Sequence, residues 1–388
     1  MKLLHTSDWH VGKTIGGNSR DDEHVAVFKE MVEMTKEHNV DVVLVAGDLF
    51  DTSSPSAGSE AIVYQALLDF ASAGATVAVI SGNHDNANRL RAIAPMAAHG
   101  RIHVVTSPHE AGESGVLRLE LENGPAVEIG MLPFVSQRGI VKTADLMDNE
   151  AARNAEIYAD RLAQLVKQIA DSFTKDAVKV LMAHSFVKGG EQGGGERLAH
   201  LVNEYAIAKD AFPKSADYVA LGHLHKNQRV GSAPEMHYCG SPLQLDFGEQ
   251  RQNKFVNLVQ VEPGRAAEVT TLKLKSGRSL ISLTGSLSEL RKYGDEYRSP
   301  DAWLRVTVTG SSMAGADLAE SVREALGERV VQIAVESSSR PPTQRTKRSG
   351  KSPTELFTEY LTEKEAVDPS VEALFNELLT EYWQESRA

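Results

Sequence analysis

Short apolar runs alternate with amphipathic stretches from residue 1 to about residue 250. Residues 41–46 form a β-branched apolar run that predicts a buried strand. In residues 21–36, Val25, Phe28, Val32 and Thr35 recur at helical spacing and predict an amphipathic helix. Further strands are expected at 2–7, 76–80, 178–182, 217–221, 255–260 and 268–274, and further helices at 59–72 and 157–169. This alternation is typical of an α/β layered core.

A smaller unit is expected beyond this core, where the pattern changes to strand, helix, strand, helix, strand. Its elements are predicted at 279–283, 287–292, 303–308, 316–326 and 330–335. Residues 337–351 are rich in Ser, Pro and basic side chains, which predicts a linker, with an electrostatic contact to DNA as the alternative role. The pattern therefore divides the chain into 1–278, 279–336, 337–351 and 352–388.

The last part, residues 352–388, predicts a helical hairpin. Ser352-Pro353-Thr354-Glu355 combines an N-cap, a first-turn proline and a capping-box acid, and a second helix is expected after Asp368. A hairpin this small cannot bury its aromatic face alone. We favour docking onto another chain over folding back onto its own domain.

Composition bounds the class of protein. The chain has 388 residues, 41% hydrophobic and 24% charged, as in soluble globular proteins of two or three domains. One cysteine, Cys239, excludes an internal disulfide framework, fits a reducing cytosol and is expected to be a buried structural thiol. Apolar runs stay well below the roughly eighteen residues of a membrane span, so we expect no membrane association.

The net charge of −12 argues against a protein that holds nucleic acid through a general basic surface. It does not exclude DNA as a substrate, because metal ions and local patches can supply a positive field. Both possibilities stay open at the level of composition.

Five short motifs rich in Asp and His follow the predicted strands. They are Asp8-Trp9-His10, Gly47-Asp48-Leu49-Phe50-Asp51, Gly82-Asn83-His84-Asp85, Ala183-His184-Ser185 and Gly222-His223-Leu224-His225. One Asp-x-His or His-x-His pair is usually structural. Five motifs at successive strand ends instead indicate oxygen and imidazole ligands delivered to one place, as in two-metal hydrolases.

The residue types indicate which metals the site would take. Carboxylate, amide and imidazole ligands without thiolates favour a pair of transition-type ions, of which manganese is the most natural. Two ions about 4 Å apart share a bridging carboxylate, for which Asp48 is the candidate. Asp8 with His10, and His223 with His225, are spaced to point the same way on extended chain, and Asn83 offers a neutral oxygen.

His84 adjoins a presumed ligand and is expected to face the substrate, placed to protonate the leaving oxygen. Asp51 is placed to hydrogen-bond His84 and raise its basicity. The glycine-rich residues 189–195 predict either a plain solvent loop, which we favour, or a mobile rim of the site.

With these motifs the chain resembles the calcineurin-like metallophosphoesterases over its first 250 residues or so, and more narrowly the SbcD family, the nuclease subunits of the bacterial SbcCD complex. The narrower resemblance rests on residues 6–13, on Gly47 to Asp51, and on Tyr238-Cys239-Gly240-Ser241-Pro242 with Leu245-Asp246-Phe247-Gly248-Glu249. It implies an α/β fold in which two mixed β-sheets are sandwiched between helices, with a small α+β capping domain and a C-terminal helical hairpin.

The resemblance also implies roles for the motif residues. Asp8, His10, Asp48 and His225 would hold one manganese ion, and Asp48, Asn83, His184 and His223 the other, with magnesium or another divalent ion as an alternative. His84 would be the catalytic histidine.

The same resemblance implies partners and activities. Residues 279–336 would cap the site and orient DNA, and 352–388 would bind the coiled-coil ATPase SbcC. A homodimer within a heterotetramer would form through helices near the site, for which 59–72 and 88–98 are candidates. The expected protein is cytoplasmic and nucleoid-associated, and acts in DNA repair, recombination and replication. It would be an exonuclease on duplex DNA and an endonuclease on single strands and hairpins.

Two other functions are weighed against this one. A phosphatase or phosphodiesterase for small esters keeps the fold, but it needs neither a capping domain nor a hairpin. A scaffold that mainly binds the ATPase would not need a complete ligand set, because unused polar ligands in a core are costly.

Overall fold

The computed structural model describes residues 1–108, 115–120, 125–136, 151–196, 206–294, 302–310, 315–336 and 353–363, together with Val371, Leu374 and Phe375. The chain divides into two compact units, Met1–Glu336 and Ser337–Ala388. Each unit is described by itself.

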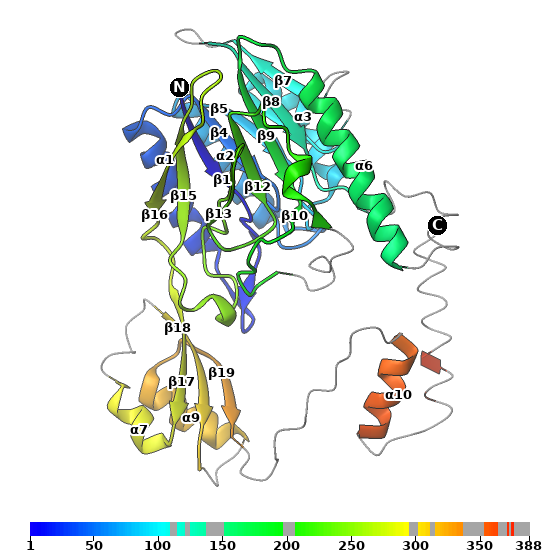
Figure 1. The fold of residues 1–388 in the computed structure, drawn as a ribbon. Helices are drawn as coiled ribbons and strands as arrows, with labels where there is room; N and C mark the ends of the chain where they lie inside the picture. Colours follow the sequence, from blue (N-terminus) through cyan, green and yellow to red (C-terminus); the bar gives the residue numbers. More distant parts are fainter. Residues whose placement is uncertain are drawn as a thin grey trace. The chain divides into compact units, whose positions relative to one another are not determined.

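Two six-stranded sheets form the body of the first unit (Figure 1). The first sheet has the order β16-β15-β1-β4-β5-β6, and the second has the order β13-β14-β12-β9-β8-β7. The strands of the first sheet are β1 (Lys2–Thr6), β4 (Val42–Ala46), β5 (Thr76–Ile80), β6 (Ile102–Val105), β15 (Phe255–Gln260) and β16 (Glu268–Lys273). Those of the second are β7 (Val116–Leu119), β8 (Val127–Leu132), β9 (Val178–His184), β12 (Tyr218–Gly222), β13 (Gln228–Ser232) and β14 (Glu235–Tyr238).

The central strands of each sheet are parallel. β1, β4, β5 and β6 run in one direction, as do β8, β9, β12 and β14, while β15, β7 and β13 pair antiparallel with their neighbours. Parallel strands end at a common edge, so each sheet collects the loops that follow its central strands. Apolar side chains of both sheets, among them Leu44, Ile80, Ile129 and Val180, form one buried cluster between them.

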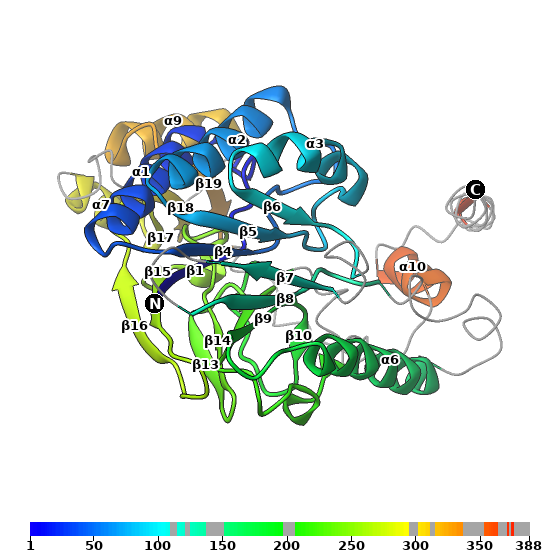
Figure 2. The same ribbon diagram turned by 90° about the horizontal axis from the view of Figure 1, so that it is seen from above.

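Helices cover the outer faces of the two sheets, as seen from above in Figure 2. α1 (Asp21–Glu37), α2 (Ala57–Ser72) and α3 (Ala87–His99) lie beyond the first sheet, and α6 (Ala151–Asp171) lies beyond the second. Phe28 of α1 and Phe70 of α2 are buried with Trp9 on the first outer face, and Leu162 and Val166 of α6 are buried on the second. The predicted sandwich of two mixed β-sheets between helices is confirmed.

A three-stranded parallel sheet forms the smaller part of the first unit. Its strands are β17 (Ser279–Gly285), β18 (Ala302–Val308) and β19 (Val330–Val335), with α7 (Leu287–Lys292) and α9 (Gly315–Leu326) packed against them. Its contacts with the larger part include a hydrogen bond of 2.8 Å from the Trp303 indole to Glu23.

Among the described residues, four short strands and two 3-10 turns also belong to the first unit. They are β2 (Thr14–Ile15), β3 (Asn18–Ser19), β10 (Phe186–Val187), β11 (Ala206–Ile207), η3 (Lys209–Ala211) and η4 (Phe247–Glu249).

In the second unit, α10 (Pro353–Glu363) follows the predicted helix start, and the rings of Phe357 and Phe375 stack with centroids 3.9 Å apart. Val371, Leu374 and Phe375 are helical, in agreement with a second hairpin helix at these positions. The remainder of that helix and the predicted linker 337–351 lie outside the described residues.

Most elements expected from periodicity are present, with ends shifted by one or two residues. α6 begins at Ala151, six residues before the expected start at residue 157. The sequence pattern did not predict β6, β7, β8 and β13. β7 and β13 are edge strands of mixed polar and apolar side chains without a strong alternation, whereas β8 is a buried central strand whose apolar run was missed. Within the described part of the chain, the helices are too short or too polar to cross a bilayer.

Candidate metal centre

The five Asp- and His-bearing motifs lie at the carboxyl ends of five central strands. Asp8 and His10 follow β1, Asp48 follows β4, and Asn83 and His84 follow β5 in the first sheet. His184 is the last residue of β9, and His223 and His225 follow β12 in the second sheet. The sandwich therefore brings all the predicted ligands and His84 to one edge.

Four of the predicted ligand residues have a left-handed backbone. Their φ angles are 52° at Asp8, 48° at His10, 52° at Asp48 and 110° at His223. Such angles are uncommon outside glycine and cost about 1–3 kcal/mol each, so they persist only where the surrounding structure enforces them. In the described residues, Asn39 and Arg101 are the other non-glycine positions of this kind. The strain is thus concentrated where the ligands are.

Glycines in the motifs allow strand ends to approach closely at this edge, both within the first sheet (Gly82) and between the two sheets (Gly222). A Cβ at Gly82 would lie 2.1 Å from Asp48 Oδ1, and a Cβ at Gly222 would lie 1.9 Å from the Ala46 carbonyl oxygen. Both distances are far below van der Waals contact, so a larger residue at either position would push the strand ends apart.

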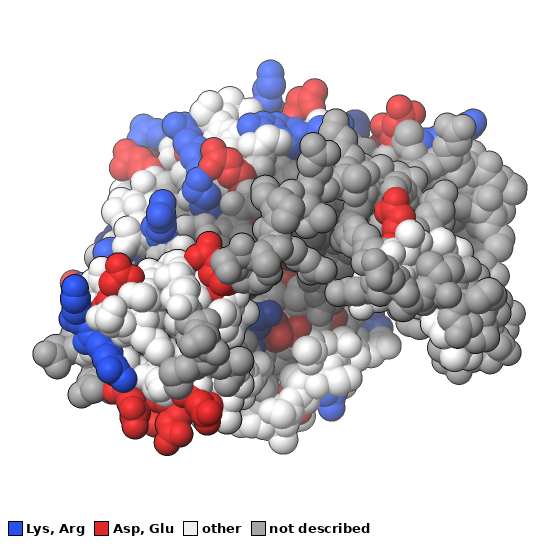
Figure 3. Space-filling model, turned by 90° about the horizontal axis from the view of Figure 1, so that it is seen from below, with Lys and Arg blue, Asp and Glu red and all other residues white. Residues whose placement is uncertain are grey.

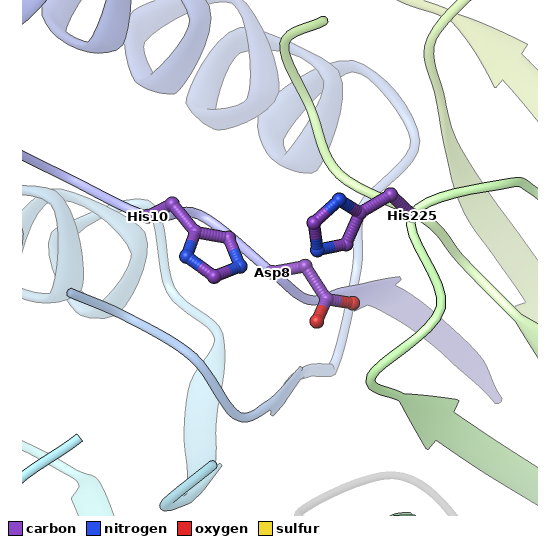
Figure 4. A group of neighbouring side chains, drawn as sticks. All are labelled: Asp8, His10 and His225. Atoms are coloured by element: carbon purple, nitrogen blue, oxygen red, sulfur yellow. The ribbon is translucent and has the colours of Figure 1, made fainter. Parts of the chain in front are cut away.

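Three overlapping groups of side chains offer ligand atoms within 4.8 Å of one another: Asp8, His10 and His225; His10, Asp48 and His84; and Asp8, Asp48 and His184. Figure 4 shows the first group, with the imidazoles of His10 and His225 next to the Asp8 carboxylate. All these side chains are buried.

Asn83, His184 and His223 converge beside these groups. The amide oxygen of Asn83 lies 3.0 Å from His184 Nε2 and 2.9 Å from His223 Nδ1. His184 Nε2 also lies 3.5 Å from Asp48 Oδ2, which links this set to the first. Asp48 therefore lies between the two sets, as predicted for a bridging ligand.

Main-chain donors orient the two central carboxylates. The amide of His84 donates to Asp48 Oδ1 at 2.8 Å, and the amide of His223 donates to Asp8 Oδ1 at 3.0 Å. The Ser7 hydroxyl donates to Asp8 Oδ2 at 2.6 Å. Each carboxylate is thus fixed by a residue from another motif.

The ring nitrogens show which atoms are left for a metal. His184 Nδ1 is bonded to the Ala46 carbonyl oxygen at 2.8 Å, and His225 Nδ1 is bonded to Glu249 Oε1 at 3.0 Å. Metal-binding histidines usually hold their second nitrogen in this way. Both nitrogens of His10 are buried without a hydrogen-bond partner among the described residues. Such unsatisfied atoms are expected where a cation binds, so the residues fit divalent metal ions.

The buried charges also call for a cation. Burial alone would raise the pKa of Asp48, but the neighbouring His184 and His10 hold it well below its usual range. Burial alone would lower the pKa of His184, yet Asp48 and Asp8 raise it to about 9. Protonated histidine thus balances the carboxylates in the absence of metal, a role that divalent ions would take over.

His84 is buried, and the centroid of its ring lies 4.5 Å from that of His10, with the two rings perpendicular. Its Nδ1 lies 2.7 Å from the main-chain oxygen of Asp51. The prediction that the Asp51 carboxylate holds His84 is corrected in this respect, because that carboxylate lies 3.5 Å from His10 Nδ1 and 3.3 Å from Lys13 Nζ. The chain turns after β4, which brings the Asp51 carbonyl, rather than its side chain, to the imidazole.

Three acids near the site, Glu249 buried and Asp85 and Glu196 half-buried, were not assigned a role from the sequence. Asp85 accepts hydrogen bonds from the amides of Gly82, Leu49 and Phe50, and burial followed by the charge of Asp48 raises its pKa to about 7. Glu249 binds the His225 ring, and Glu196 accepts from the His225 amide at 3.0 Å. Asp85 and Glu249 lie within quoted motifs, which was the available signal.

The glycine-rich loop, residues 189–195, packs against the site. Glu196 accepts hydrogen bonds from the amides of Gly193 and Gly194, and Gln252 donates to the Gly193 carbonyl at 2.6 Å. A Cβ at Gly195 would lie 2.6 Å from Glu249 Oε1 and 3.0 Å from His225 Nδ1. The favoured interpretation of a plain solvent loop is therefore wrong for this end of the loop.

Acidic and basic side chains are intermixed on the described part of the face shown in Figure 3. The described part of this face is therefore not a general basic surface, in agreement with the net charge of −12.

Comparisons with known proteins agree with this geometry. The model of the calcineurin-like phosphoesterase family matches residues 1–227, and a model described as the type 5 capsule protein repressor C-terminal domain matches residues 276–365. The chain is 32% identical to the SbcD subunit of the SbcCD nuclease of Bacillus subtilis, over 84% of this chain and 83% of that protein. It is 28% identical to the SbcD subunit of the same nuclease of Escherichia coli K12, over 80% of this chain and 78% of that protein.

Proposed function

Because the chain belongs to the calcineurin-like phosphoesterases, and within them to the SbcD subunits of SbcCD nucleases, it is a metal-dependent phosphodiesterase, and we propose that its substrate is DNA. The observation that carries this proposal is the meeting of seven oxygen and nitrogen ligands and His84 at one edge of the sandwich. The sequence similarity to the SbcD subunit of Bacillus subtilis extends over 84% of the chain, and thus beyond residues 1–227 that match the phosphoesterase family.

Two manganese ions are the proposed cofactors. Asp8, His10, Asp48 and His225 would hold one ion, and Asp48, Asn83, His184 and His223 the other. The mixture of carboxylate, amide and imidazole donors favours manganese over magnesium, which prefers oxygen ligands alone. When bound, such ions activate water and neutralise charge on the phosphate oxygens.

His84 is the proposed general acid. Its Nδ1 faces the Asp51 carbonyl oxygen, which accepts a hydrogen bond from that nitrogen and so favours the protonated ring. Nε2 then carries the proton for the leaving oxygen of the substrate. Asp51 acts on His84 through its main chain, and its carboxylate pairs with Lys13 at 3.3 Å.

The proposed activities are exonuclease cleavage of duplex DNA and endonuclease cleavage of single strands and hairpins, in DNA repair, recombination and replication. We assign the nuclease domain to residues 1–278 and the capping domain, which orients DNA over the site, to residues 279–336. The protein would act in the cytoplasm at the nucleoid.

The hairpin of residues 352–388, beyond the linker 337–351, is the proposed binding site for an SbcC-type ATPase. Tyr360, Val371 and Leu374 are exposed on it, with exposed fractions of 51%, 40% and 53%. Leu68 of α2 and Met96 of α3 are exposed as well, and these helices are the proposed interface of a homodimer within a heterotetramer.

The experiment that tests this function is cleavage of an end-labelled hairpin DNA with a single-stranded tail in the presence of Mn²⁺. We expect the wild-type protein to cut, and His84→Ala to lower kcat by about 10²–10⁴-fold, as for loss of a general acid. The exposed His99 at the end of α3 provides the matched control His99→Ala, which should cut normally.

Mn²⁺ binding, measured by titration, should be unchanged in His84→Ala. An equal loss of metal from this variant would contradict its role as acid. Turnover of a small phosphate ester orders of magnitude above that of DNA would exclude DNA as the substrate.

A further inference from the structure

Glu249 is a buried carboxylate that connects a predicted metal ligand to a buried cation. Its Oε1 lies 3.0 Å from His225 Nδ1, and its Oε2 accepts from Lys254 Nζ at 2.6 Å. Lys254 Nζ also donates to the carbonyl oxygen of His225 at 3.1 Å and to Ser241 Oγ at 2.8 Å. Ring and main chain of His225 are therefore both fixed by this pair.

The arrangement determines which His225 nitrogen is free. A carboxylate can only accept, so Nδ1 must carry the proton and Nε2 is left for the ligand group that includes Asp8 and His10. Gly195 lies against the Glu249–His225 hydrogen bond, since a Cβ there would be 2.6 Å from Glu249 Oε1. The main chain of Gly195 thus covers this hydrogen bond.

The segment that carries Glu249 is held by the edge strand β17 of the small sheet. The amide of Leu280 donates to the side-chain oxygen of Gln244 at 2.7 Å, and the amide of Ser282 donates to that of Gln250 at 3.0 Å. These two glutamines flank η4, whose last residue is Glu249.

Phe247 of η4 adds an apolar contact to the same strand. It is buried in a cluster with Leu280 and Trp303 of the small sheet, and the Arg305 guanidinium lies 4.7 Å above its ring. The described residues thus form a continuous path from β17 through η4 and Glu249 to His225.

We propose that Glu249 is a positioning residue through which the small sheet of residues 279–336 controls the metal ligand His225. The inference rests on the proposed function in one respect, that His225 holds a metal ion. A displacement of β17 would move Gln244, Phe247 and Gln250, and with them the carboxylate that orients the ring. DNA bound against the small sheet would in this way change metal affinity.

The first test is Mn²⁺ affinity of the full-length chain, measured by the electron paramagnetic resonance signal of free Mn²⁺. We expect Glu249→Gln to weaken binding of one ion about 10–100-fold, the usual effect of losing such a partner. The matched control is Glu235→Gln. Glu235 is also buried and lies between a histidine, His237, and a cation, Arg229, but outside the ligand groups. It should change Mn²⁺ affinity less than about twofold.

Glu249→Gln leaves Lys254 buried without its counter-ion, so the double variant Glu249→Gln/Lys254→Met is measured beside it. Its core is neutral, yet the anionic acceptor for His225 is still missing, and we expect the same loss of Mn²⁺ affinity. Wild-type affinity in either folded variant would overturn the positioning role.

The coupling between β17 and His225 is tested with the double variant Gln244→Ala/Gln250→Ala, which removes the side-chain oxygens that accept hydrogen bonds from β17. We expect a several-fold loss of Mn²⁺ affinity that disappears in the Glu249→Gln background, because both changes act on the same path. Unchanged affinity, or equal losses in both backgrounds, would overturn the coupling.

His225→Ala separates this inference from the proposed function. Normal Mn²⁺ binding by His225→Ala would contradict the ligand assignment itself. Loss of binding in His225→Ala with wild-type binding in Glu249→Gln would overturn the positioning role of Glu249 alone.

Discussion

Single atoms decide how the strand ends meet at the metal centre. Gly82 has no side chain in the space where Asp48 Oδ1 lies, and His5 is buried below the site with Nδ1 2.9 Å from the Tyr218 hydroxyl. A methyl group added at Gly82 would have no room, and a proton added to the His5 ring at Nε2 would have no hydrogen-bond partner among the described residues. Each position therefore gives a prediction for one residue.

Gly82→Ala should lower Mn²⁺ affinity at least tenfold and destabilise the protein by about 1–3 kcal/mol, the usual cost of overpacking. The new Cβ would lie 2.1 Å from the presumed bridging carboxylate of Asp48. Gly58→Ala is the control, since its Cβ would meet its first neighbour at 3.7 Å. Mn²⁺ titration and urea unfolding of both variants measure these effects. Normal Mn²⁺ binding by Gly82→Ala would show that the strand ends can separate without cost.

His5 predicts a loss of stability in acid. Burial, followed by the nearby His237, lowers the pKa of His5 to about 3, below its ordinary value of 6.5. Between these pH values the unfolded chain binds the proton and the folded chain does not. The free energy of unfolding therefore falls as the pH is lowered from 6.5 towards 3.

One pKa unit corresponds to about 1.4 kcal/mol, so His5 contributes on the order of 4 kcal/mol over this range. His5→Asn should show a smaller fall than the wild type. Urea unfolding at several pH values, in the presence of EDTA to exclude competition between protons and metal, measures the two slopes. Equal slopes would show that His5 is not responsible.

At the scale of secondary structure, α1 joins the larger part of the first unit to the small sheet. Glu23 in its first turn accepts from Arg20 Nε at 3.0 Å, from the Trp303 indole at 2.8 Å and from the Arg278 amide at 2.6 Å. Arg20 is fully buried and also donates to the Gln244 carbonyl. The helix and the small sheet are therefore fixed at the Glu23 carboxylate, and the segment before η4 is fixed at the Arg20 guanidinium that Glu23 binds.

Glu23→Gln should destabilise the protein by about 3–5 kcal/mol, because it leaves the buried Arg20 guanidinium without its counter-ion. Glu33→Gln on the same helix is the control, since its pair with Lys36 is exposed and should contribute little. Urea unfolding of the two variants measures the difference. Similar small effects in both would show that the Arg20 charge finds another partner.

At the scale of the whole molecule, the candidate metal centre and the hairpin proposed to bind the partner belong to separate compact units. The metal centre belongs to Met1–Glu336, while the exposed apolar side chains of the hairpin belong to Ser337–Ala388. The net charge of −12 also means that the isolated chain has little general attraction for DNA. A partner that supplies DNA contacts would remove this limit.

Removal of residues 352–388 should abolish binding of the ATPase partner and leave Mn²⁺ affinity and single-strand cleavage unchanged. The reason is that the ligand groups lie wholly in the other unit. Size-exclusion co-elution with the partner and Mn²⁺ titration of the truncated chain measure the two properties. Retained partner binding would place the interface elsewhere.

The sequence by itself predicted the α/β alternation, the small sheet and the candidate ligand residues, while the sandwich of two sheets followed from the resemblance to a known family. Strand periodicity and side-chain chemistry are local properties, so Asp8, Asp48 and His184 could be identified from the runs that precede them. Edge strands such as β13 were missed because half-exposed strands carry a weak pattern.

Only the tertiary structure decided which of these residues contact one another, and through which atoms. Only the pairing of β4 with β5 shows that Gly82 faces Asp48 and that the Asp51 carbonyl, not its carboxylate, holds His84. Glu249 was visible in its motif, but its contact with His225 spans 24 residues, and β17 contacts the segment that carries it through Gln250. Such contacts join chain segments whose distance in space the sequence does not encode locally, which is why the positioning network appeared only in the fold.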